Sequence, residues 1–256
     1  MSWLQGFGAW IEEILAHLGL YASFLGRTLK RLGSRPLYWR LIVQQAEMVG
    51  VQSLPVVLLT ALFTGMVLAL QSYIAFHRFG AESMVAVVVS LSMLRELGPV
   101  LVGLMVSGRV GASFAAELGT MRVSEQIDAL WTLSTDPVRY LILPRLLAAT
   151  LMLPLLVIVA DMIGITGGYV ISVGMLHQNP SVYIDKTTLY LQLNDFYSGL
   201  VKAGFFGMLI GLIGCTEGFY CRGGAAGVGR ATTRAVVIAS MSILVSDYFL
   251  TAWMFG

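Results

Sequence analysis

The sequence predicts an all-α membrane protein, with an N-terminal amphipathic interfacial helix followed by five transmembrane helices, N-terminus inside and C-terminus outside. Each predicted span has at least about 20 residues, the length that an α-helix needs to cross about 30 Å of hydrocarbon. Only helices and closed barrels satisfy their backbone hydrogen bonds in lipid, and long apolar runs without strict alternation favour helices. The five almost purely apolar stretches are 51–75, 84–107, 141–176, 196–219 and 235–256.

The composition excludes an ordinary soluble domain. Hydrophobic residues make up 57% of the chain and charged residues only 12%, whereas soluble domains carry about 25% charged residues. The 256 residues therefore suit a single membrane domain over 36–256, preceded by a separate segment over 1–35. No nucleic-acid partner is expected, and the three histidines and two cysteines lack the spacing of a metal site.

Residues 1–35 form the predicted interfacial helix. Arg27, Lys30 and Arg31 close this segment, and Pro36 then breaks the chain. A helix packed on a soluble core is the alternative, but the rest of the chain offers no such core, so the membrane surface is favoured. The apolar residues that recur at helical spacing are Trp3, Phe7, Trp10, Ile14, Leu18, Tyr21 and Leu25.

The distribution of basic residues predicts the topology. Of 16 Lys and Arg residues, only Arg78 and Lys186 lie in the loops after the first and third spans. Twelve lie on the other side, which the positive-inside rule makes cytoplasmic. Those twelve are Arg27, Lys30, Arg31, Arg35, Arg40, Arg109, Arg122, Arg139, Arg145, Arg222, Arg230 and Arg234.

The cytoplasmic stretch after the second span predicts a coupling helix at about 117–133. Ile127 and Leu130 share one helical face, and Glu125 and Asp128 share the other. A short amphipathic helix of this kind suits insertion into the groove of a partner ATPase, to which we assign these four residues. The alternative is a helix that lies flat on the membrane.

Any ATPase is expected to be another polypeptide. The glycine-rich segment 224–231 resembles a phosphate-binding loop, but Arg230 stands where that loop needs Lys, and Ala231 where it needs Ser or Thr. ATP and Mg²⁺ would therefore bind the partner, and this chain is expected to hold no cofactor.

Charges within the spans mark a candidate site. Arg95 and Glu96 lie near the middle of the second span, where each charge costs at least about 2.5 kcal/mol to insert. Pro99 frees a backbone carbonyl near residue 95. Glu96 is expected to face a hydrated lipid cavity; the alternative is a buried structural pair with Arg95. Lys202 is expected to reach the outer interface, and Asp247 needs a partner that the sequence does not identify. The predicted lipid-binding residues are Leu68, Gln71, Ala75, Phe76, Phe79, Glu96 and Leu97.

Motifs along most of the chain resemble those of the MlaE (YrbE-type) permeases. The resemblance covers about residues 40–256, and its motifs are long and ordered. They are RELGPV at 95–100, GRVGA at 108–112, AELGTM at 116–121, EQIDAL at 125–130, Asp136-Pro137 and GRATTR at 229–234.

The resemblance implies the membrane subunit of an ABC transporter that moves phospholipid between the inner and outer membranes of Gram-negative bacteria. It also implies a homodimer that works with a cytoplasmic ATPase (MlaF type), a STAS-domain protein (MlaB type) and a periplasmic MCE-domain hexamer (MlaD type). A chloroplast relative exists, but the chain shows no transit peptide, so the bacterial inner membrane is expected.

Two other classes of function compete with the permease. A stand-alone secondary transporter or channel could use Arg95, Glu96 and Asp247 as an ion relay, but such proteins normally contain internal repeats, and five spans form no clean pair. An intramembrane lipid-modifying enzyme would need a nucleophile and base or a metal site, and no such group is recognisable in the spans.

Overall fold

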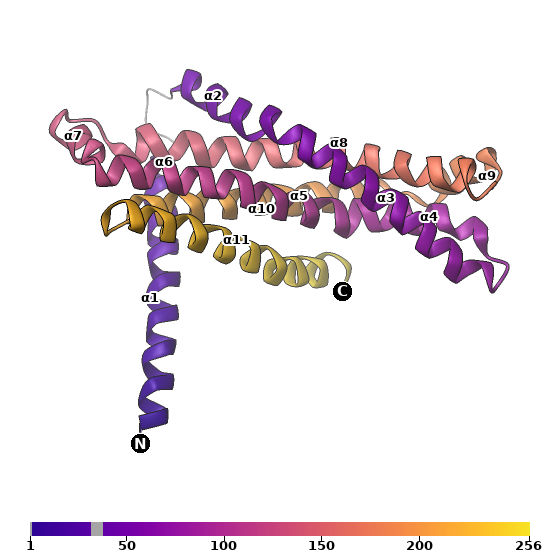
Figure 1. The fold of residues 1–256 in the computed structure, drawn as a ribbon, viewed down its shortest axis with the longest axis horizontal. Helices are drawn as coiled ribbons and strands as arrows, with labels where there is room; N and C mark the ends of the chain where they lie inside the picture. The colour runs from indigo at the N-terminus through magenta and orange to yellow at the C-terminus, as the bar shows by residue number, and fades with distance from the viewer. Residues whose placement is uncertain (1, 32–37) are drawn as a thin grey trace.

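The computed structural model describes the backbone of residues 2–31 and 38–256, and within its first helix the side chains of residues 12, 15, 16 and 19–30. Over these residues the regular elements are all helices, arranged as a long bundle with one helix lying across it (Figure 1). The α-helices are α1 Ser2–Lys30, α2 Trp39–Val49, α3 Leu54–His77, α4 Val85–Ser92, α5 Gly98–Val106, α6 Ala112–Val123, α7 Gln126–Thr132, α8 Leu143–Gly174, α9 Pro180–Tyr190, α10 Leu193–Phe219 and α11 Gly224–Phe255.

Short helical turns join several of these helices. Two are 3-10 turns, at Val51–Ser53 and Glu82–Met84. Three are π-helical turns, at Met93–Leu97, Ser107–Gly111 and Val138–Ile142. Because a π-turn inserts an extra residue into the helix and often marks a functional position, the turn that carries Arg95 and Glu96 is notable.

Five helical segments are long and apolar enough to span a membrane, which confirms the predicted number of spans. The shortest has 27 residues, or about 40 Å of helix. Several of these segments are longer than the apolar stretches in the sequence, because the helix continues into the polar residues at either end. The segments are Trp39–His77, Glu82–Val123, Val138–Gly174, Leu193–Phe219 and Gly224–Phe255.

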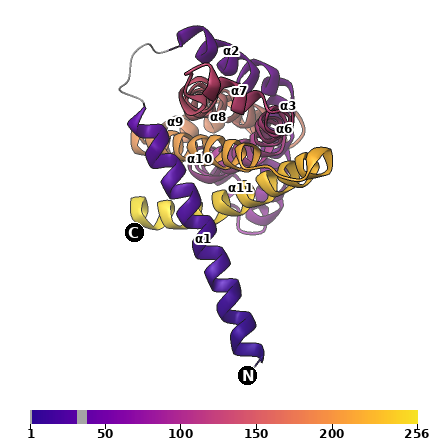
Figure 2. The same cartoon turned by 90° about the vertical axis from the view of Figure 1, so that its left-hand side faces the viewer.

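Helix α1 lies across the end of the bundle that carries α7, and its N-terminal part extends away from the other helices (Figures 1 and 2). Near its C-terminal end, the Tyr21 hydroxyl donates to Glu217 Oε1 at 2.5 Å. Phe24 is fully buried against Phe219. A helix perpendicular to the spans is the arrangement expected of an interfacial helix. The predicted boundary at 35/36 and the side chains from Trp3 to Leu18 in the apolar series lie outside the described residues.

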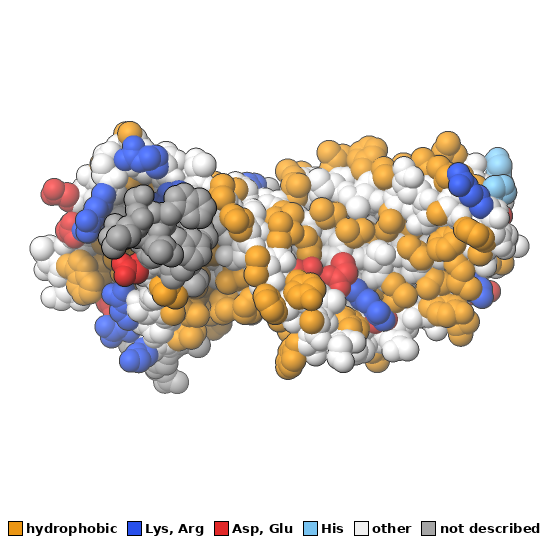
Figure 3. Space-filling model, turned by 90° about the horizontal axis from the view of Figure 1, so that it is seen from below, with side chains coloured by type: hydrophobic (Ala, Val, Ile, Leu, Met, Phe, Trp, Pro, Cys, Tyr) orange, Lys and Arg blue, Asp and Glu red, His pale blue; other side chains and the backbone are white. Residues whose placement is uncertain are grey.

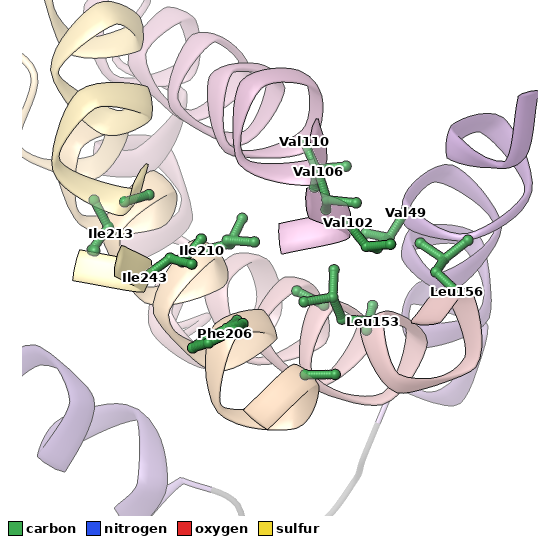
Figure 4. Close-up of a cluster of buried hydrophobic side chains, with 14 of the residues drawn as sticks. Val49, Val102, Val106, Val110, Leu153, Leu156, Phe206, Ile210, Ile213 and Ile243 are labelled. Atoms are coloured by element: carbon green, nitrogen blue, oxygen red, sulfur yellow. The ribbon is translucent and has the colours of Figure 1, made fainter. Parts of the chain in front are cut away.

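Glycines allow the closest helix contacts. A β-carbon added to Gly65 of α3 would lie 1.8 Å from the carbonyl oxygen of Gly164 in α8, and one added to Gly207 of α10 would lie 2.4 Å from that of Ala149 in α8. Small residues at such crossings let helix backbones pack together in lipid. One buried apolar cluster joins α5, α8, α10 and α11, and it includes Val102, Leu153, Phe206, Ile210 and Ile243 (Figure 4).

The chain ends part-way along the bundle. Helix α11 starts at the α7 end, and its C-terminus stops short of the end where α9 lies (Figure 1). Helix α9 lies between α8 and α10 in the chain, where Asn179 caps it by accepting a hydrogen bond from the Ser181 N–H at 3.0 Å. Asn at the N-cap followed by Pro180 is a typical helix start.

The inside-to-outside orientation stays a prediction, and cysteine labelling tests it. In intact spheroplasts, an impermeant maleimide should label Thr188→Cys on α9 and leave Thr132→Cys on α7 unlabelled until the cells are lysed. Both positions are exposed, and the native Cys215 and Cys221 are buried. Labelling of Thr132→Cys in intact spheroplasts would reverse the topology.

Candidate functional site

A buried lysine on α10 organises a group of charges inside the bundle. Lys202 has no exposed surface. Its Nζ donates to Glu96 Oε2 at 2.6 Å, lies 3.1 Å from Asp247 Oδ1 and donates to Thr251 Oγ1 at 2.6 Å. We call Lys202, Glu96, Asp247 and Thr251 the lysine cluster. It corrects the expectation that Lys202 reaches the outer interface, and it supplies the partner that Asp247 needs.

The π-turn and the proline after it shape this site. Pro99 has no N–H to bond the carbonyl of Arg95, and Lys202 Nζ donates to that carbonyl at 3.0 Å. The free carbonyl that Pro99 was expected to leave is therefore part of the site. The ammonium of Lys202 on α10 thus contacts two other helical segments, since its partners lie on the π-turn and on α11.

Arg95 and Glu96 point to different partners, as expected of neighbours on a helix. Arg95 forms an ion pair with Asp195 at 2.6 Å, and its guanidinium carbon lies 4.6 Å from the ring centre of Phe255. The buried Asp195 also caps α10, because its carboxylate accepts from the Gln192 N–H at 3.0 Å. Arg95 is thus held in a structural ion pair, whereas the Glu96 side chain pairs with Lys202 and remains 38% exposed.

Two apolar hollows are lined in part by sequence neighbours of the lysine cluster, Leu97 after Glu96 and Ser246 before Asp247. One, of about 400 Å³, is lined by Leu68, Gln71 and Leu97 together with Phe63, Thr64 and Val67. The other, of about 500 Å³, lies between α10 and α11 and includes Leu250. Figure 3 shows acidic and basic side chains within the largely apolar middle of the face that it displays. Charge beside apolar hollows suits an amphipathic ligand.

The structure brings some of the predicted lipid-binding residues together and leaves others apart. Leu68, Gln71 and Leu97 share one hollow. Phe76 is half-buried against the core, while Ala75 is exposed. Phe79 is 82% exposed beyond the end of α3. The set as a whole stays a prediction.

The predicted coupling region is a broken helix. Helix α6 ends at Val123, and α7 begins after Glu125, whose φ of 60° turns the chain. Ile127 is fully buried and Leu130 is half-buried against the core, so these two hold α7 on the bundle rather than forming a free docking face. Glu125 and Asp128 are exposed, and Asp128 pairs with Arg122 at 2.6 Å.

Comparison with known proteins identifies the family. The family model for the permease MlaE matches residues 42–253. The chain belongs to the MlaE permease family. It is thus a multi-pass inner-membrane permease subunit, and the stand-alone transporter is not favoured.

Relatives from three bacteria agree with this membership. A probable ABC transporter permease protein of Rickettsia conorii is 53% identical over 238 residues, which cover 93% of this chain and 92% of that protein. A probable ABC transporter permease protein of Synechocystis is 44% identical, over 96% and 92% of the two chains. The intermembrane phospholipid transport system permease protein MlaE of Haemophilus influenzae is 39% identical, over 100% and 98%.

Sequence reasoning found Glu96 but missed two residues that contact it. Lys202 and Thr251 belong to the site through contacts between distant parts of the chain. A signal was available for Lys202, because an ionisable residue inside a span is by default a functional candidate. Among the described residues, no group of three or more His, Cys, Asp or Glu side chains could hold a metal ion.

Proposed function

We propose that this MlaE-family permease moves phospholipid between the inner and outer membranes of a Gram-negative envelope, and that the lysine cluster binds the lipid headgroup. The observation that carries the proposal is a fully buried ammonium, Lys202, held between carboxylates beside two apolar hollows. The name of the Haemophilus relative, a phospholipid transport permease, supports the same class of substrate.

The cluster has the chemistry to bind a headgroup reversibly. Lys202 faces Glu96 and Asp247, and Thr251 lies 3.2 Å from Glu96 Oε1. A lipid phosphate could take over hydrogen bonds from Lys202, while Glu96 could accept from an amine or hydroxyl of the headgroup. Because these groups already satisfy one another, the empty site remains stable until a headgroup exchanges with them.

The hollows suit the acyl chains. Leu68, Val67 and Leu97 line one of them, and Leu209, Phe249 and Leu250 line the other. Both open on the outside of the single chain, where lipid or a second subunit would complete their walls. A lipid bound here would place its headgroup at the cluster and its chains against these apolar surfaces.

Helix α11 supports a homodimer. One side of it packs into the bundle through small residues such as Ala231, Ala235 and Ala239. The other side exposes large apolar side chains, which a second copy could cover. Those exposed by at least a third of their surface are Val237, Met241, Leu244, Val245, Tyr248, Phe249, Trp253 and Phe255. In this arrangement two lysine clusters would face a shared lipid cavity.

A separate ATPase would drive the transport, as the ABC permease names of the relatives imply. A STAS-domain protein beside the ATPase and an MCE-domain hexamer on the periplasmic side complete the proposed assembly. The exposed carboxylates Glu125 and Asp128, at the turn into α7, are the proposed ATPase contacts.

Charge reversal tests that contact. The double variant Glu125→Lys/Asp128→Lys should release the ATPase during purification, because two repulsive charges replace two attractive ones at the interface. The control Glu12→Lys/Glu47→Lys makes the same change in net charge at exposed positions away from α7. Stoichiometric recovery of the ATPase with the first variant, with hydrolysis still coupled to lipid, would place the docking site elsewhere.

Neutralising Glu96 tests the headgroup site. Glu96→Ala should lower ATP-dependent phospholipid transfer between vesicles at least about tenfold, since a charged hydrogen bond contributes about 1.5–3 kcal/mol. Assembly with the ATPase should persist, because Glu96 lies far along the bundle from α7. Glu47→Ala, at an exposed carboxylate on α2, is the control. Wild-type transfer and lipid yield in Glu96→Ala would remove this carboxylate from the mechanism.

A further inference from the structure

A polar cavity lies beside α1, at the opposite end of the bundle from α9. It has a volume of about 330 Å³ and is enclosed by three elements: Leu20 of α1, the last turn of α10 and the first turns of α11. Three arginines line it, namely Arg222, Arg230 and Arg234. It contains none of the residues of the lysine cluster.

Two of these arginines have no counter-charge among the side chains that the structure describes. Arg234 Nε lies 3.5 Å from Glu217 Oε2. Among the residues whose side chains are described, neither Arg222 nor Arg230 has a carboxylate within ion-pairing distance. The single acid of the lining, Glu217, leaves the cavity with a surplus of two positive charges.

Glu217 does not neutralise Arg222 or Arg230, because its carboxylate is already bound by other side chains. The Tyr21 hydroxyl donates to Glu217 Oε1 at 2.5 Å. Burial, and then the hydrogen bond to Glu217, raises the pKa of Tyr21, so the phenol keeps the proton that it donates. Tyr21 and Arg234 thus hold the carboxylate against the wall of the cavity, and Arg222 and Arg230 remain available to an anion.

The position of Arg230 follows from the glycine turn. A β-carbon added to Gly223 would lie 2.9 Å from Arg230 Nη2, so this guanidinium lies directly against the turn that begins α11. Gly223 has a φ of 93°, in the left-handed region that favours glycine. The turn at Gly223 separates Arg222 from the start of α11, and its conformation brings the guanidiniums of Arg222 and Arg230 to the border of one cavity.

The place of the cavity indicates which anion it takes. It opens beside α1, which lies across the bundle as an interfacial helix does, and Leu20 and Ala231 give it an apolar edge. Guanidinium groups bind phosphate through paired hydrogen bonds, and basic pockets beside spanning helices suit anionic headgroups. We propose that this cavity binds the phosphate group of an anionic phospholipid in the leaflet that contacts α1, as a site separate from the lysine cluster.

This inference goes beyond the proposed function, because it concerns other residues at another end of the bundle. The lipid would bind the start of α11 through its phosphate and Leu20 of α1 through its apolar part, in addition to the direct contacts of α1 with α10 at Tyr21 and Phe24. It would thus stabilise α1 in its position across the bundle. Transport by the lysine cluster is a separate property with separate residues.

Native mass spectrometry tests the proposal by measuring lipid binding to the full chain, in the complex in which the chain is isolated. The probes are dioctanoyl phosphatidylglycerol, dioctanoylglycerol, which lacks the phosphate, and inorganic phosphate. Arg222→Gln/Arg230→Gln should weaken phosphatidylglycerol binding at least about tenfold and remove one bound lipid per chain. Lys30→Gln/Arg40→Gln, which removes two exposed charges outside the cavity, should leave binding unchanged.

The comparison separates this site from the lysine cluster and from other ligands. Lys202→Met should retain the lipid that Arg222→Gln/Arg230→Gln loses, so failure of one site does not imply failure of the other. Unchanged binding in a folded Arg222→Gln/Arg230→Gln complex would overturn the proposal. If dioctanoylglycerol bound as tightly as phosphatidylglycerol, the cavity would recognise only the apolar part of the lipid. If inorganic phosphate bound as tightly as phosphatidylglycerol, the cavity would be a site for free anions.

Discussion

Replacing Lys202 by methionine should reduce lipid transport to background. The ammonium is fully buried and contacts Glu96, Asp247 and Thr251. Without it, two neighbouring carboxylates lose their shared cation, and breaking a buried ion pair in this way costs about 3–5 kcal/mol. The measurement is ATP-dependent phospholipid transfer between proteoliposomes, together with thermal melting of the purified chain.

A compensated variant separates binding from stability. Lys202→Met combined with Glu96→Gln and Asp247→Asn removes the uncompensated charges, so melting should return toward the wild-type temperature while transport stays absent. Lys186→Met, at the lysine on α9, makes the same substitution outside the site. If the compensated variant regains transport, the cluster serves only to hold the helices together.

The second large effect is expected at the crossing of α3 and α8. Gly65→Ala should destabilise the bundle by about 3 kcal/mol or more, because overpacking of a tight contact already costs 1–3 kcal/mol where side chains can yield. Here the new methyl group meets backbone, at 1.8 Å from the Gly164 oxygen and 2.6 Å from its carbon, and backbone cannot rotate away. The melting temperature and the yield of extracted protein should both fall.

Gly174→Ala is the matched control for that substitution. Gly174 ends α8, and a β-carbon there meets nothing within 4 Å. Alanine is the better helix former, so this change should be neutral or slightly stabilising. Equal melting temperatures for Gly65→Ala and Gly174→Ala would show that the two helices can separate at their crossing without cost.

The sequence by itself determined the class of the protein and the number of its spans. Apolar length is a local property, and a run of about 20 residues without charge has one stable conformation in lipid. The ordered motifs predicted the family in the same way, since they need only the identity and order of residues. The sequence also marked Glu96 and Pro99 as a candidate functional position, because a charge and a helix breaker inside a span are costly wherever they occur.

Only the tertiary structure decided which charges pair. Lys202 and Glu96 are 106 positions apart, and Arg95 and Asp195 are 100 apart, so no local pattern connects them. Hydrophobic periodicity placed Ile127 on an apolar face, but it could not distinguish a face that docks a partner from one buried in the same chain. The arginines beneath α1 appear in the sequence as a bias toward one side of the membrane. Packing of α1 against α10 brings them to the border of one cavity.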